Sequence, residues 1–200
     1  MKFLTLEGVD GAGKSTHIEF IADAVRTKGA HVIVTREPGG TELAEKLRHA
    51  ILEQPMSPIV ETLLIFAARA DHVERVIKPA LASGQWVICD RFTDATAAYQ
   101  GAGKGVSMDL IARLAEAAHP GLQPSRTLIF DCPYDVAAAR LAKAGRTLDR
   151  FEREDRAFFE RVRAAYLAIA KREPQRMRLI DASVNAAQVR EQIKTALEGL

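Results

Sequence analysis

Cysteine is scarce in this sequence, and the net charge is small. Among 200 residues there are 2 cysteines, Cys89 and Cys132, and they form no CxxC pair. Because both lie in apolar, strand-like runs, we expect two buried thiols rather than a disulfide or a metal site. The 5 histidines show no metal-ligand spacing either. A formal net charge of +2 is too small to indicate a surface that binds nucleic acid or a membrane.

Long apolar segments are also lacking. No run reaches the roughly 18 apolar residues that a membrane-spanning helix needs. The first residues lead directly into a short apolar run, without the apolar core that is typical of a signal peptide. The G-x-S-x-G motif of a serine nucleophile does not occur. We therefore expect a cytoplasmic protein with one domain, residues 1–200, and no membrane partner.

The sequence does contain a regular alternation of short apolar runs with helical patterns. The runs predict strands at 2–7, 31–35, 86–90, 127–131 and 177–180. The helical patterns predict helices at 14–28, 41–53, 58–82, 107–118, 134–144, 153–172 and 186–199. Strands separated by helices indicate an α/β fold, with a parallel sheet covered on both faces. In such sheets ligands bind beyond the carboxyl ends of the strands.

The first predicted strand is followed by the pattern G-x-x-x-x-G-K-[ST]. Its residues are Gly8, Val9, Asp10, Gly11, Ala12, Gly13, Lys14 and Ser15, with Thr16 next. Between a strand and a helix this pattern predicts a loop whose backbone N–H groups surround phosphates at the positive end of the helix. Lys14 is expected to reach the β- and γ-phosphates, and Ser15 to ligate Mg²⁺. The alternative is a glycine-rich turn without a ligand, but the match favours a nucleoside triphosphate site.

Charged pairs follow the second and third predicted strands. Arg36 and Glu37 precede a Pro-Gly-Gly loop, and Asp90 and Arg91 end the third strand. Asp90 is suited to hold Mg²⁺ directly or through water, whereas the planar fork of Arg91 suits a phosphate. Each pair alone could be a solvated strand end. Beside a phosphate loop, the two pairs together favour one functional cleft.

Two further segments carry candidate binding groups. Arg69 lies on the predicted helix 58–82, three residues after Phe66. This Arg either extends from a helix edge to water or donates to a flat base that stacks on Phe66, and the residues alone leave the two readings about even. The stretch 95–105 places hydroxyl and amide groups among small residues, which suits either close approach of a ligand or a flexible loop.

Positive charge is concentrated between the two helices predicted at 134–144 and 153–172. The basic residues are Arg140, Lys143, Arg146, Arg150 and Arg153. Such a cluster is usually only a solvated face. Near a triphosphate, however, an Arg on a mobile segment stabilises the charge that develops during phosphoryl transfer.

Together these motifs resemble the bacterial thymidylate kinase family, and the resemblance covers the whole chain. It is carried by the phosphate loop and by TREPGGT at 35–41, FAAR at 66–69, DRF at 90–92, AYQG at 98–101 and LDR at 148–150. The resemblance implies a P-loop NTPase fold of three α/β/α layers, with a five-stranded parallel sheet and a short basic lid at about 140–152. It also implies Mg²⁺-dependent transfer of the ATP γ-phosphoryl group to dTMP, giving dTDP for dTTP and DNA synthesis, in a homodimer.

The resemblance further implies roles for individual residues. Gly8 to Thr16 would hold ATP, and Ser15 and Asp90 would serve the metal. The catalytic group would be Lys14, Asp10, Arg91 and a lid cation, for which Arg146 and Lys143 are the candidates because Gly11 stands where some members carry Arg. The acceptor site would comprise Glu37, Arg48, Phe66, Arg69, Arg91, Thr96, Tyr99 and Gln100.

Within the acceptor site the implied contacts differ from residue to residue. Glu37 would act near the sugar and metal, and Arg48 and Arg91 would bind the acceptor phosphate. Phe66 would stack on thymine while Arg69 bonds its carbonyl. Thr96 and Gln100 would meet the base edge, and Tyr99 would crowd the 2′ position. The alternatives are a kinase for another nucleotide or a nucleoside, and a nucleotide-binding switch without a small-molecule acceptor.

Overall fold

Parallel strands form the centre of the molecule. The computed structural model describes residues 2–27, 29–143, 145 and 147–200. In this part of the chain there are five strands, β1 (Phe3–Gly8), β2 (Val32–Arg36), β3 (Trp86–Asp90), β4 (Arg126–Asp131) and β5 (Met177–Asp181). Their order is β2-β3-β1-β4-β5, and every neighbouring pair is parallel. The predicted five-stranded parallel sheet is confirmed.

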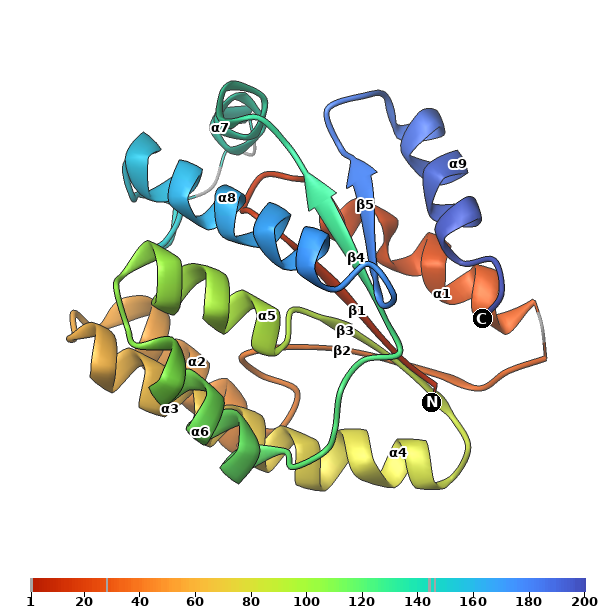
Figure 1. Cartoon of the computed structure of the whole chain (residues 1–200), viewed down its shortest axis with the longest axis horizontal. Helices are drawn as coiled ribbons and strands as arrows, with labels where there is room; N and C mark the ends of the chain where they lie inside the picture. Colours follow the sequence, from red (N-terminus) through yellow and green to blue (C-terminus); the bar gives the residue numbers. More distant parts are fainter. Residues whose placement is uncertain (1, 28, 144, 146) are drawn as a thin grey trace.

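Helices cover both faces of this sheet. They are α1 (Ile18–Arg26), α2 (Glu42–Glu53), α3 (Pro58–His72), α4 (Lys78–Ala82), α5 (Thr93–Thr96), α6 (Met108–Ala118), α7 (Tyr134–Lys143), α8 (Arg156–Arg172) and α9 (Ala186–Ala196). Figure 1 shows α1 and α9 on one side of the sheet and α4, α5 and α8 on the other. The helices α2, α3 and α6 lie farther out, next to one another. None of the described helices is long and apolar enough to cross a membrane.

The central strand β1 explains why the sheet is covered on both sides. All six residues of β1 are buried, and Phe3, Leu4 and Leu6 have no exposed surface. Burying each such side chain contributes about 1.5–3 kcal/mol, so a strand of this composition is stable only between two layers. Because β1 pairs with β3 and β4, the loop that follows Gly8 emerges at the middle of the carboxyl edge.

The helix predicted at 58–82 is interrupted. Ser57 caps its start by accepting a hydrogen bond from the Val60 N–H at 3.3 Å, but α3 gives way to a π-helical segment, η2 (Val73–Ile77), before α4 begins. The wider turn precedes Pro79, which has no N–H to donate and whose ring crowds the carbonyl four residues earlier. The periodicity therefore predicted the extent of the helix correctly, and Pro79 indicated a kink or an end, but the π-helical form of the interruption was not predicted.

The stretch 95–105 is also helical rather than a flexible loop. It comprises the end of α5 and a π-helical segment, η3 (Ala97–Gly103). A Cβ at Gly103 would approach Phe158 Cε2 of α8 at 2.5 Å, and one at Gly101 would approach the Met108 sulfur at 2.7 Å. The glycines here permit close packing against neighbouring helices, so their presence does not indicate flexibility.

Candidate active site

The turn after β1 has the geometry of a phosphate-binding loop. Gly8, Gly11 and Gly13 have φ values of 134°, 80° and 87°, a region that side chains with a Cβ rarely adopt. The loop leads into the 3₁₀ turn η1 (Lys14–His17), which continues as α1. Lys14 is buried and donates to the carbonyl oxygens of Gly8 at 3.1 Å and Val9 at 3.4 Å. Burial lowers the pKa of Lys14, and an anion in the loop would favour its charged form.

Two adjoining cavities lie at this edge of the sheet, one beside the phosphate loop and one between α3, α5 and η3. The first is lined by the loop residues from Asp10 to His17 and by Asp90 and Arg140. The second is lined by Ile65, Arg69, Thr96, Tyr99 and Gln100. Asp10, Glu37, Arg48 and Arg91 line both. The turns after the first three strands thus converge as the sequence predicted, and we call the two spaces the donor cavity and the acceptor cavity.

Arg91 lies at the junction in a strained backbone conformation. Its φ is 70°, which is unusual for a residue with a side chain. Its Nη2 donates to Asp10 Oδ1 at 2.5 Å and to the Tyr99 hydroxyl at 3.0 Å. Although burial favours the neutral acid, the charges of Arg91 and Lys14 hold the pKa of Asp10 below its usual value. Asp10 is therefore a carboxylate fixed beside a guanidinium at the junction.

Asp90 lines the donor cavity and has a buried carboxylate oxygen beside it. In the described part of the chain its buried Oδ1 has no hydrogen-bond partner, although buried polar atoms are nearly always bonded. Ser15 lines the same cavity and is exposed. An unpaired carboxylate oxygen and a hydroxyl beside a phosphate loop are donors that suit Mg²⁺, so the residues present fit the ion.

Arg69 is held almost completely by other residues. Its Nε donates to Glu37 Oε2 at 2.6 Å, and its Nη2 donates to the Phe92 carbonyl and to Thr96 Oγ1, both at 3.1 Å. The side chains of Arg69 and Glu37 are each 2% exposed. Among the described residues its buried Nη1 has no partner. Arg69 also lines the acceptor cavity, so its guanidinium is a rigidly held cation at the wall of this cavity.

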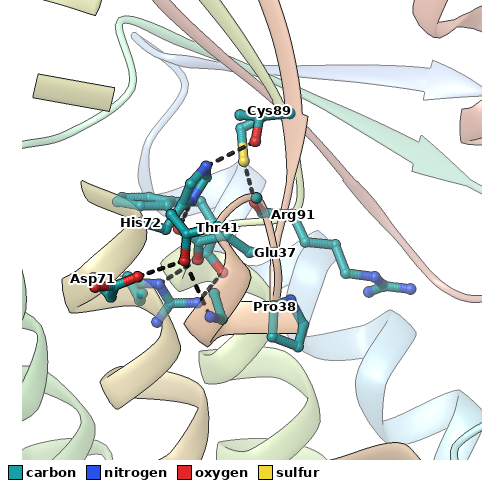
Figure 2. Close-up of polar contacts among 12 residues, drawn as sticks. Glu37, Pro38, Thr41, Asp71, His72, Cys89 and Arg91 are labelled. Carbon is teal, nitrogen blue, oxygen red and sulfur yellow. Dashed lines mark hydrogen bonds and ion pairs between the residues drawn. The ribbon is translucent and has the colours of Figure 1, made fainter. Parts of the chain in front are cut away.

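Glu37 is oriented from its other side by His72 (Figure 2). His72 Nδ1 lies 3.0 Å from Glu37 Oε1, and its Nε2 lies 2.7 Å from Thr35 Oγ1. Burial opposes ionisation, but Arg69 and His72 hold the pKa of Glu37 below its usual value. Glu37 therefore bridges β2 to α3 as a buried carboxylate that positions Arg69.

Glu37, His72 and Cys89 also approach one another closely enough to be considered as metal ligands. Their ligand atoms all lie within 4.8 Å. However, both His72 nitrogens have partners, and Cys89 Sγ donates to the Arg91 carbonyl at 3.1 Å (Figure 2). Burial raises the pKa of the Cys89 thiol well above its usual value. Hydrogen bonding accounts for this group, and both cysteines are free and buried, as predicted.

Phe66 does not occupy the place expected for it. Its ring packs with Val106 and Ile111, and the Arg69 guanidinium carbon lies 4.7 Å from its centroid. Among the described residues the acceptor cavity is lined instead by Ile65, one position earlier. One residue is about 100° of rotation on a helix, so the aromatic faces α6, and the sequence did not show which side would face the cavity.

The basic lid segment is divided among several environments. Arg140 Nη1 donates to the Ala12 carbonyl at 3.4 Å and lines the donor cavity. Lys143 is exposed at the end of α7, and Arg146 lies outside the described residues. Arg150 Nη2 donates to the Ile51 carbonyl at 2.7 Å and is paired with Glu61. The sequence left open which of Arg140, Lys143, Arg146 and Arg150 reaches the phosphates, because a contact such as that of Arg140 with Ala12 spans 128 residues.

Fold and site together define a kinase of the phosphate-binding-loop class. The model of the thymidylate kinase family matches residues 6–193. The chain therefore belongs to the thymidylate kinase family, and it is an enzyme, a transferase of nucleotide biosynthesis.

Named relatives agree with this assignment. The chain is 56% identical to thymidylate kinase of Bordetella petrii over 199 residues, which are 100% of this chain and 96% of the relative. It is 55% identical to that of Cupriavidus metallidurans, over 94% of both chains. The crystal structure of thymidylate kinase from Ehrlichia chaffeensis superposes with a TM-score of 0.78 at 34% identity, covering 96% of this chain and 97% of that one.

Proposed function

We propose that this protein transfers the γ-phosphoryl group of ATP to dTMP, giving dTDP for dTTP and DNA synthesis in the cytoplasm. The family assignment makes it a kinase that phosphorylates dTMP. The observation that carries the detailed proposal is the junction of donor and acceptor cavities at Asp10, Arg48 and Arg91. Phosphoryl transfer depends on positioning and on neutralising charge, and this junction supplies both.

On the donor side, the loop from Gly8 to Thr16 would bind the ATP phosphates through backbone N–H groups. Lys14 would leave its carbonyl partners for the β- and γ-phosphates. Ser15 and Asp90 would hold Mg²⁺, which when bound neutralises charge on the phosphates. Among the described lid residues, Arg140 is best placed to add a cation, because it already contacts the loop at Ala12.

On the acceptor side, Arg48 and Arg91 would bind the dTMP phosphate at the junction. Arg69 Nη1 would donate to the thymine O4 carbonyl, and Ile65, which lines the cavity, would take the apolar role expected of Phe66. Thr96 and Gln100 would meet the base edge. Tyr99, whose hydroxyl donates to Asp10 Oδ2 at 2.8 Å, would exclude a 2′-hydroxyl by its bulk.

Exposed apolar side chains on α3 support the homodimer that the family resemblance implied. Ile59, Val60 and Leu63 are 45–46% exposed, and Leu43 of the neighbouring α2 is 49% exposed. Large apolar residues gathered on one surface mark an interaction site in many proteins. We propose that a second copy of this chain covers them.

Release of ADP, measured by a coupled assay with each of the four deoxynucleoside monophosphates, tests the proposed function. We expect turnover with dTMP to exceed turnover with dCMP, dAMP and dGMP. Comparable turnover with dCMP or dGMP would reject thymine specificity. ATP hydrolysis that no monophosphate alters would instead support a nucleotide-binding switch.

A further inference from the structure

A buried carboxylate lies behind the acceptor cavity, outside the residues that line it. Glu61, in the first turn of α3, has no exposed surface. Its Oε1 accepts a hydrogen bond from Gln100 Nε2 at 2.8 Å, and its Oε2 accepts one from Lys104 Nζ at 2.9 Å. Arg150 Nη2 lies 2.5 Å from the same Oε2. The two cations offset the cost of burying this charge.

The charge of Glu61 determines which end of the Gln100 amide faces it. A carboxylate only accepts hydrogen bonds, so the amide must present its NH₂ group to Glu61. Gln100 is 2% exposed and lines the acceptor cavity. The amide oxygen, Oε1, is therefore the end left for a ligand, and among the described residues no hydrogen bond occupies it.

The acceptor cavity consequently presents a fixed pair of groups. Glu37 fixes Arg69 through its Nε, which leaves the buried Nη1 as a donor without a partner among the described residues, and Glu61 fixes Gln100 through its Nε2, which leaves Oε1 as an acceptor. Thymine offers the complement, a carbonyl acceptor at C4 and a donor at N3. Cytosine offers an amino donor at C4 and an acceptor at N3, so it mismatches both groups.

We infer that Glu61 is a positioning residue for substrate specificity: by holding the Gln100 amide in one orientation, it makes the cavity select a base that donates from its ring nitrogen. The inference rests on the proposed function, because it takes dTMP as the occupant of this cavity. Glu61 contacts Gln100 rather than the ligand, so its effect is on selectivity between bases rather than on the transfer step.

The Glu61→Gln variant tests this role. Lys104 and Arg150 would keep the amide oxygen at position 61 facing them, so its NH₂ group would face Gln100 and draw the Gln100 oxygen away from the base. Dissociation constants for dTMP, dUMP and dCMP are measured calorimetrically. We expect the preference for dTMP over dCMP to fall about tenfold. Thymine N3–H loses its hydrogen bond to Gln100 Oε1, and cytosine N3 no longer faces another acceptor. The ratio of dTMP to dUMP should not change, since uracil has the same C4 and N3 groups, and neither should the KM for ATP.

A double variant, which combines Glu61→Gln with Gln100→Glu, exchanges the two groups and keeps one carboxylate and one amide in the pair. The amide introduced on α3 then donates to the carboxylate introduced on η3. The second oxygen of that carboxylate accepts from the base, so the preference for dTMP over dCMP should return. If the single variant does not fold, the double variant carries the test. Glu42→Gln, on an exposed side chain of α2, is the matched control and should behave as the wild type.

The inference is overturned if a folded Glu61→Gln variant keeps the wild-type ratio of dTMP to dCMP, or if it loses affinity for dTMP and dUMP unequally. A folded double variant without base selectivity overturns it as well. Wild-type protein that does not prefer dTMP would instead contradict the proposed function, so the two failures are distinguishable.

Discussion

Replacing Arg69 by lysine tests whether the acceptor cavity binds dTMP independently of ATP in the donor cavity. Alanine is the less informative choice, because it would leave Glu37 as a buried charge without its partner, at about 3–5 kcal/mol of stability. Lysine keeps a cation near Glu37, where the present Nε–Oε2 distance is 2.6 Å. It removes the fork that reaches Phe92 and Thr96 and, with it, the unpaired Nη1 donor.

The expected loss of dTMP affinity follows from these contacts. A hydrogen bond from a charged donor contributes about 1.5–3 kcal/mol, so the dissociation constant for dTMP should rise about 10- to 100-fold. The donor cavity does not include Arg69, so ATP affinity should stay within about twofold, as distant sites behave independently. The Arg75→Lys variant, on an exposed side chain paired with Asp71, is the control and should leave both affinities unchanged.

Calorimetric titration of each nucleotide into both variants gives these constants directly. A variant whose ATP affinity collapses while dTMP binding persists would place Arg69 in the donor site. Unchanged binding of both would show that Nη1 meets no ligand, and the assignment of the acceptor cavity would have to be withdrawn.

Three further measurements test other parts of the site and fold. Lys14→Ala should lower kcat by about 10²–10³-fold, the usual loss for a group that stabilises developing charge. Turnover at the wild-type rate would show that Lys14 takes no part in the transfer step. Burial and Asp94 raise the pKa of Glu7 to about 8, so the folded state holds a proton that the unfolded state has lost above pH about 4.3. Stability should therefore fall as pH rises from that value to about 8, and urea unfolding of Glu7→Gln should lack this fall; identical pH profiles would contradict the assigned protonation. Leu63→Glu should yield monomers by light scattering, whereas an unaltered dimer would place the interface elsewhere.

Much of the architecture could be predicted because its causes are local. Buried strands have continuous apolar runs, and a threonine is a common helix cap: Thr41 accepts from the Ala44 N–H at 3.0 Å at the start of α2. The phosphate loop is likewise a contiguous pattern. Pro79 indicates a kink in the helix 58–82, but the π-helical segment η2 depends on how that proline is accommodated, and periodicity does not show this.

The acceptor side was less predictable because its contacts are distant in the sequence. Glu61 meets Gln100 and Lys104, which are 39 and 43 residues away, and nothing in its neighbourhood distinguishes it from an exposed helical acid. The difference between Ile65 and Phe66 depends on the rotation of α3 against α6. The sequence did not predict the positive φ of Arg91 either, because arginine rarely adopts such a conformation.

The position of β1 has a consequence for motion. Its amides are shielded by a paired strand on each side and a helical layer above and below, so their hydrogen exchange should require opening of the whole domain. β2, in contrast, is an edge strand whose residues are half-buried or exposed. The phosphate loop is thus anchored to the strand that we expect to exchange most slowly, whereas β2, which leads to Glu37 at the wall of both cavities, should exchange through local opening at the edge of the sheet.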